Sequence, residues 1–77
     1  MRKFLNITSN SEILGGKPCI RGTRISVELI MEWLSSGGTP DEIAKKHPLL
    51  KPEHVLEAIG YAAYFAKNEI LIEAEAV

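Results

Sequence analysis

The sequence predicts a mainly α-helical protein, in which a three-helix bundle of helix-turn-helix type follows a short N-terminal β-arm or hairpin. Three observations lead to this fold. Apolar residues recur at helical spacing in three segments after residue 25. Glycine and proline separate these segments. Before residue 26 the chain has only short apolar stretches between turn-forming residues, which is typical of a small hairpin.

A chain of 77 residues is long enough for a single domain. We expect a β-arm at residues 1–25, a helical core at residues 26–69 and a C-terminal tail at residues 70–77. A domain of this size buries a modest core and often gains stability from a partner.

The arm contains two apolar stretches that we expect to be short strands, Phe4–Ile7 and Glu12–Leu14. Gly15–Gly16 permits positive φ angles and therefore predicts a tight turn after the second stretch. Cys19–Ile20 then pairs back as a further short strand, and Gly22 supplies another turn before the helices begin.

The first helix begins after Ser26, whose hydroxyl is a preferred N-cap. Glycine is common just past a helix end, so Gly37 and Gly38 end this helix. Its apolar face is formed by Val27, Ile30, Met31 and Leu34, widened by Leu29 and Trp33.

The second helix has the clearest start signal in the chain. Thr39 is the expected cap, Pro40 stands at the first helical position, and Glu42 follows three residues after the cap, as in a capping box. The helix is short, because it must end before Pro48.

The third helix starts at Pro52 and runs to about Glu69. A short turn joins it to the second helix, so these two have helix-turn-helix proportions. We expect its core-facing stripe to consist of Val55, Leu56, Ile59, Ala62, Ala63, Ala66 and Ile70.

The composition excludes several classes of protein. Cys19 is the single cysteine, so no disulfide forms within the chain, and a lone cysteine favours a reducing cytoplasm. We find neither a signal peptide nor an apolar run of membrane-spanning length. The net charge is −1, with the basic excess in the first half and the acidic excess in the second. We therefore expect a cytoplasmic protein without a membrane partner.

Few residues could support catalysis. His47, His54 and Cys19 fit no nucleophile–base pattern and no standard zinc spacing, and the glycines lack the spacing of a phosphate loop. Cys19 is expected to be a small buried apolar side chain. The sequence thus predicts a non-enzymatic protein without catalytic residues, metal site, cofactor or small-molecule substrate.

Nucleic-acid binding is the chemical function that the sequence favours. In a helix-turn-helix the second helix enters the major groove, but here its first turns carry Glu53 and Glu57, which repel phosphates. We therefore expect the basic arm to supply much of the contact. Alternatively, its arginines pair with Glu28 or Glu32 and fix the arm on the helices. The candidate DNA-binding residues are Lys17, Arg21, Thr23, Arg24, Lys51 and His54.

The end of the third helix is apolar outside its core stripe, and a small monomer cannot bury all of this surface. We expect a second copy of the chain or another protein to cover it. Alternatively, the last turns fold back on the arm. The candidate interface residues are Tyr61, Tyr64, Phe65, Leu71 and Ile72.

The stretch GGKPCIRGTRISV, followed by GGTPDEIAKKHPLLKPEHVLEAIGYA, resembles the domain-of-unknown-function family 433 (DUF433) over about Ile7 to Lys67. The resemblance implies a homeodomain-like or winged-helix-like three-helix fold. It also implies a role as the antitoxin of a type II toxin–antitoxin pair, similar to VapB-type antitoxins, with a PIN-like ribonuclease toxin as partner. The positions that match the family motif are Gly16, Lys17, Pro18, Arg21, Gly22, Thr23, Arg24 and Val27.

The leading functional expectation is therefore a homodimeric antitoxin that binds its toxin through apolar surface and operator DNA through the helix-turn-helix and arm. The alternative is a protein-interaction module or small transcriptional regulator of helix-turn-helix shape without a toxin partner. The acidic third helix favours this alternative.

Overall fold

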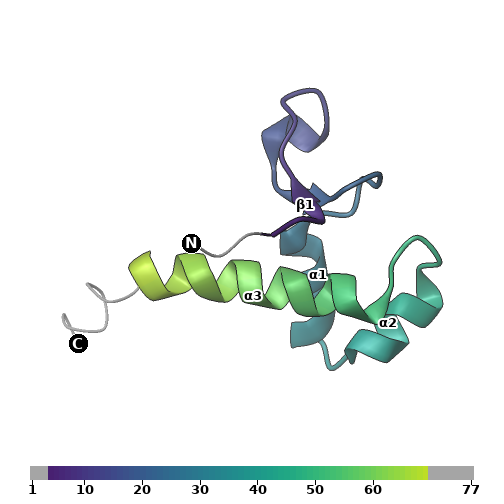
Figure 1. The fold of residues 1–77 in the computed structure, drawn as a ribbon. Coiled ribbons are helices and arrows are strands. Elements are labelled where there is room, and N and C mark those ends of the chain that lie inside the picture. Colours follow the sequence, from purple (N-terminus) through teal and green to yellow (C-terminus); the bar gives the residue numbers. More distant parts are fainter. Residues whose placement is uncertain (1–3, 70–77) are drawn as a thin grey trace.

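The computed structural model describes residues 4–69 and is mainly helical (Figure 1). Three helices follow a small antiparallel sheet of two strands, so the prediction of a helical core preceded by a short hairpin is confirmed. The elements in chain order are β1 (Ile7–Thr8), a 3-10 turn (Leu14–Gly16), β2 (Cys19–Ile20), α1 (Val27–Ser35), α2 (Pro40–Lys46) and α3 (Pro52–Glu69).

The first strand differs from its predicted position. Phe4 begins a turn, since its carbonyl oxygen accepts a hydrogen bond from the Ile7 N–H at 3.1 Å, and β1 spans only Ile7–Thr8. β1 pairs with β2, with Ile7 opposite Ile20 and Thr8 opposite Cys19. The pairing partner of β1 is thus the strand that the sequence predicted at Cys19–Ile20.

The prediction of a strand at Glu12–Leu14 is wrong. Ile13 makes only an isolated bridge to Asn10, and Leu14 begins the 3-10 turn with a positive φ of 53°. The N–H groups of Gly16 and Lys17 donate to the carbonyl oxygens of Ile13 and Leu14, so the chain reverses here. The chain reversal predicted at Gly15–Gly16 is therefore present. It begins one residue earlier, at Leu14, so the residues predicted to form the second strand lead into the turn instead.

The helix starts follow the capping chemistry of the sequence. The Ser26 hydroxyl accepts a hydrogen bond from the Leu29 N–H at 3.0 Å, which caps α1. Thr39 and Glu42 form the predicted capping box at the start of α2. Gly37 follows the end of α1 with a φ of 102°, a conformation that glycine adopts without steric cost.

The core lies where the arm and the three helices meet. Its buried apolar side chains are Cys19, Ile20, Val27, Ile30, Ile43, Leu50, Val55 and Ala58. Cys19 is fully buried and unpaired by any disulfide, as predicted. The core is therefore built by β2 together with all three helices.

The predicted core stripe of α3 is partly wrong. Leu56 is 58% exposed and Ala63 is also exposed, whereas Ala58 is fully buried. The residues of α3 that pack into the core are Val55, Ala58, Ile59 and Ala62, joined by Tyr61. The helix is therefore rotated relative to the predicted stripe, with Ala58 toward the core and Leu56 toward solvent.

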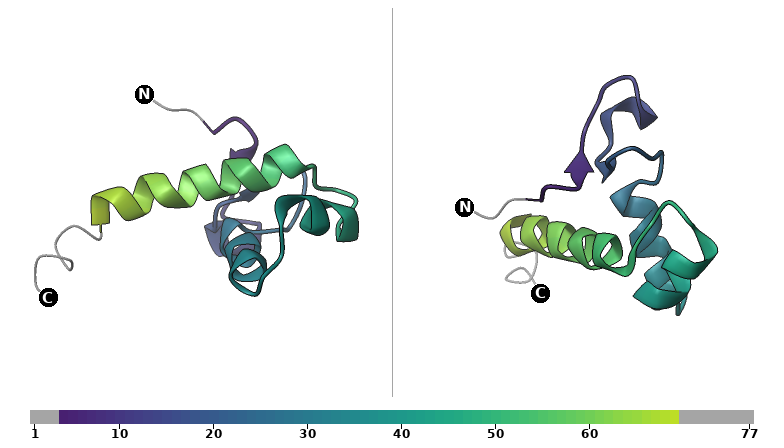
Figure 2. Two further views of the ribbon diagram at one scale, coloured as in Figure 1. Left: turned by 90° about the horizontal axis from the view of Figure 1, so that it is seen from below. Right: turned by 45° about the vertical axis from the view of Figure 1, so that its right-hand side comes forward.

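The helices are not arranged as a parallel bundle. α1 crosses α3, α2 lies beside the first half of α3, and the last turns of α3 project beyond both (Figures 1 and 2). Phe4, at the start of the described chain, lies against α3 through ring contacts with Tyr61 and Tyr64. Ile70 of the predicted stripe and the tail at 70–77 lie outside the described residues.

Candidate functional site

The basic side chains of the arm are largely engaged within the fold. Lys17 Nζ lies 2.9 Å from Glu28 Oε1 in an exposed ion pair between the arm and α1. The hydrogen bond to Glu28, followed by the charge of that carboxylate, raises the pKa of Lys17. A basic arm residue thus pairs with Glu28, but the residue is a lysine rather than an arginine.

Arg21 closes the arm on itself. Its guanidinium nitrogens Nε and Nη2 donate to the Leu5 carbonyl oxygen at 3.2 and 3.1 Å. Its backbone N–H also donates to the Asn6 carbonyl oxygen at 2.7 Å. Although the side chain is exposed, its position is fixed by the turn that precedes β1.

Thr23 and Arg24 differ sharply in exposure. Thr23 is only 8% exposed; its hydroxyl donates to the Ile20 carbonyl oxygen at 2.8 Å and accepts from the Ile25 N–H at 3.0 Å. Both hydrogen-bonding roles of the hydroxyl are therefore used within the turn. Arg24 is exposed, and its guanidinium has no hydrogen bond or ion pair with any residue in the described range 4–69.

Lys51 and His54 lie together at the start of α3. The Lys51 N–H donates to His54 Nδ1 at 3.1 Å, so the imidazole caps the first turn of the helix. The side chain of Lys51 is exposed, and Glu53 beside it is exposed as well. The two candidate residues are close in space, but one nitrogen of His54 is occupied by the cap.

The aromatic surface, which we define as Tyr61, Tyr64 and Phe65, is continuous along α3. The ring of Phe65 lies 4.8 Å from that of Tyr61 and 5.4 Å from that of Tyr64, measured between centroids. Phe4 contributes from the arm, with edge contacts to Tyr61 at 5.2 Å and Tyr64 at 6.1 Å. Tyr61 is half-buried, whereas Tyr64 and Phe65 are each 43% exposed.

Three of the five predicted interface residues thus form one cluster. Leu71 and Ile72 lie outside the described residues, as does the alternative in which the last turns fold back on the arm. The sequence did not predict the contribution of Phe4. Phe4 and Tyr61 are 57 positions apart, and hydrophobic periodicity relates only residues that are close together in the chain.

An apolar groove adjoins the aromatic surface. It has a volume of about 410 Å³ and lies between α1 and α3, with the Lys17–Glu28 ion pair at its rim. Its apolar lining consists of Pro18, Val27, Met31, Tyr61, Ala62 and Phe65. Two members of the aromatic surface are therefore also walls of this groove.

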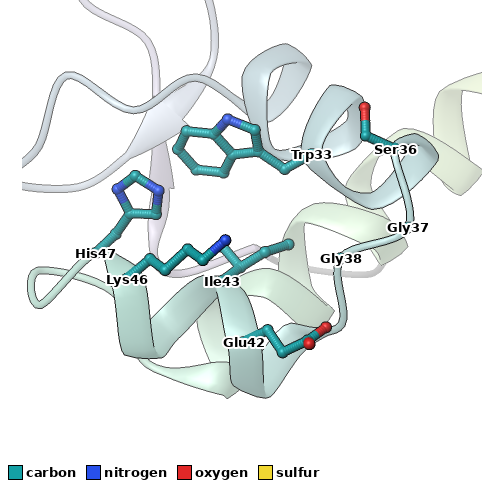
Figure 3. A pocket seen from close by; sticks show the side chains of 8 residues that line it. All are labelled: Trp33, Ser36, Gly37, Gly38, Glu42, Ile43, Lys46 and His47. Carbon is teal, nitrogen blue, oxygen red and sulfur yellow. The ribbon is translucent and has the colours of Figure 1, made fainter.

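A second pocket, of about 400 Å³, lies between α1 and α2 (Figure 3). The rings of Trp33 and His47 stack there at 4.1 Å with an interplanar angle of 10°. Lys46 and Glu42 line it from α2, and Gly38 lies at its edge. The sequence placed His47 only at a helix end; the stack depends on how α1 and α2 pack, so no local signal reveals it.

The described residues lack two kinds of feature. Residues 4–69 contain no group of three or more histidine, cysteine, aspartate and glutamate side chains arranged to hold a metal ion. Among the helices of this same range, none combines the length and the apolar character required to cross a membrane.

The fold and its surfaces define a small helical domain with a hairpin arm, whose projecting helix carries an aromatic surface beside a groove. The family model described as "Protein of unknown function (DUF433)" matches residues 7–62, and the chain belongs to this family. Searches among curated proteins and among solved structures gave no match.

Proposed function

We propose that this protein is the antitoxin of a type II toxin–antitoxin system, and that it neutralises a PIN-like ribonuclease in the cytoplasm by binding it. The resemblance of the family motif motivates the class. The observation that carries the proposal is the aromatic surface on the projecting part of α3, next to an apolar groove.

Leaving this apolar surface in water is energetically unfavourable. Tyr64 and Phe65 are each 43% exposed, and the groove beside them is lined mainly by apolar side chains. Burying apolar surface contributes roughly 25 cal/mol per Å², and aromatic side chains are frequent anchors of protein interfaces. A partner that inserts an apolar segment into the groove would cover Phe65, which lines it, and would approach Tyr64, whose ring lies 5.4 Å from that of Phe65.

The same surface is proposed to pair two copies of the chain when no toxin is present. A homodimer about a two-fold axis uses one self-complementary patch, and here the exposed ring of Tyr64 lies beside the groove between α1 and α3. Toxin and second copy then compete for a shared surface.

The decisive experiment is co-expression of the chain with the product of the neighbouring reading frame. We expect the wild-type chain to co-purify with that protein and suppress its ribonuclease activity. Phe65→Glu should abolish both effects, because it places a charge in the groove wall. Leu56→Glu is the matched control, since Leu56 is exposed on the same helix but does not line the groove.

Circular dichroism must show that both variants are folded. Neutralisation that survives in Phe65→Glu would contradict the proposed surface. In sedimentation, the wild-type chain alone should be a dimer and Phe65→Glu a monomer. A wild-type chain that stays monomeric at high concentration would contradict self-association but leave toxin binding untouched.

Operator-DNA binding is a second proposed function. It is favoured by the succession of α2, a turn at residues 47–51 and α3, which has the proportions of a helix-turn-helix. The alternative is an interaction module of the same shape without DNA activity. It is favoured by Glu53, which is exposed in the first turn of α3 where DNA would approach.

A further inference from the structure

Three lysines border the turn between α2 and α3, and only Lys51 among them was a candidate from the sequence. Lys45 and Lys46 are in the last turn of α2, and Lys51 immediately precedes α3. All three side chains are exposed, and none forms an ion pair with any other described residue. We refer to these three residues as the lysine turn.

The backbone that carries the lysine turn is held at several points. The His47 N–H donates to the Ile43 carbonyl oxygen at 3.0 Å, and the His47 ring stacks on Trp33. The Leu50 N–H donates to the His47 carbonyl oxygen at 2.8 Å, while the Leu50 side chain is buried in the core. The lysines therefore extend from a fixed frame rather than from a loose loop.

Acidic side chains near the lysine turn do not neutralise it by direct pairing. Asp41 and Glu42 precede Lys45 and Lys46 by one helical turn, yet no ion pair forms between them. One oxygen of Glu42 accepts the Thr39 N–H of the capping box at 3.0 Å.

The arm offers less available charge. Lys17 is paired with Glu28, Arg21 is bound to a carbonyl oxygen, and the hydroxyl of Thr23 is used within its turn. Of the arm residues predicted to bind DNA, only the Arg24 guanidinium is both exposed and without a partner within residues 4–69.

We infer that the lysine turn, rather than the arm, is the surface that contacts the phosphates of duplex DNA. The inference rests on the operator-DNA function proposed above and deepens it. Phosphate contacts fix the register of a helix-turn-helix on the duplex, and lysine and arginine supply most of their charge. Lys51 also adjoins the N-terminus of α3, where the helix dipole favours an anion.

The test exploits the salt dependence of binding. Fluorescence anisotropy with a short labelled duplex, titrated at several salt concentrations, gives the slope of log K against log salt. The slope is negative, and each phosphate contact contributes about 0.9 to its magnitude. The triple variant Lys45→Gln, Lys46→Gln, Lys51→Gln should therefore reduce this magnitude by about 2.7. The operator sequence is not needed, because this electrostatic term is independent of sequence.

A charge-matched control removes the same three positive charges elsewhere: Lys17→Gln, Arg24→Gln, Lys67→Gln. This control should reduce the magnitude of the slope by less than half as much as the lysine-turn variant. A magnitude that falls equally in both variants, or more in the control, overturns the inference while DNA binding stands. A wild-type chain that does not bind the duplex even at low salt overturns DNA binding and this inference together, without affecting toxin binding.

Discussion

The carboxylate of Glu57 on α3 accepts two hydrogen bonds from Asn6 in the arm, one from the backbone N–H at 2.7 Å and one from the side-chain amide at 3.0 Å. This pair joins segments 51 positions apart and fastens the arm to the helix beside the aromatic surface. Glu57 was expected to be one of the glutamates that face a phosphate backbone. Its carboxylate instead has a structural role.

Removal of this carboxylate should loosen the arm. Glu57→Ala leaves the Asn6 N–H without its acceptor in a partly buried site, so we expect a loss of about 1–3 kcal/mol in the free energy of unfolding. Chemical denaturation measures this loss. Glu53→Ala is the control on the same helix, since Glu53 is exposed and should change stability by less than about 0.5 kcal/mol. Equal losses in both variants would show that the Asn6 contact contributes nothing.

The rotation of α3 and the position of the core can be tested with two truncations. Ile30 is fully buried, so Ile30→Ala should lower the free energy of unfolding by about 2–5 kcal/mol and could unfold so small a domain. Leu56 is 58% exposed, so Leu56→Ala should cost less than about 0.5 kcal/mol. Thermal melts compare the two. A large loss in Leu56→Ala would favour the stripe predicted from the sequence over the rotation in the structure.

The stack of His47 on Trp33 should contribute to stability and to fluorescence. His47→Ala removes an aromatic contact of about 0.5–1.5 kcal/mol. Trp33 is the single tryptophan of the chain, so its emission reports this contact directly. His54→Ala is the control: it removes a hydrogen bond at the start of α3 but should leave the emission spectrum unchanged. An unaltered spectrum in His47→Ala would indicate that the two rings do not stack in solution.

The Lys17–Glu28 pair should make a small contribution that depends on pH. The hydrogen bond and charge of Glu28 raise the pKa of Lys17 above its ordinary value of 10.5, so the charged lysine is favoured in the folded state. The contribution is fully present below that ordinary value and is lost as pH rises through the higher pKa of the folded protein. The effect is small because both side chains are exposed to water.

The comparison of wild type with Lys17→Gln tests this dependence. The difference in melting temperature should be small at neutral pH and should vanish once the pH exceeds the raised pKa. Lys67→Gln serves as the control, because it removes a lysine that has no part in this ion pair. A difference that persists or grows at high pH would show that Lys17 acts through packing rather than charge.

The sequence by itself determined where the helices begin and end. Ser26, Thr39 and Pro52 provide local capping chemistry, which acts within one helical turn and can therefore be read from neighbouring residues. For the same reason, positive φ angles were predicted at Gly15–Gly16 and a turn at Gly22, and all three glycines have positive φ angles. The matching motif also gave the family, since its residues are close together in the chain.

The tertiary structure alone decided how these elements use their side chains. Packing against α1 and α2 sets the rotation of α3, which buries Ala58 and exposes Leu56, although a count of large apolar residues favours the reverse. Pairing with distant groups decides which charges remain available: Lys17 is held by Glu28, whereas Lys51 has no ion-pair partner within the described part of the chain. Periodicity and capping report on residues a few positions apart, but contacts such as Asn6–Glu57 arise only when the folded chain brings remote segments together.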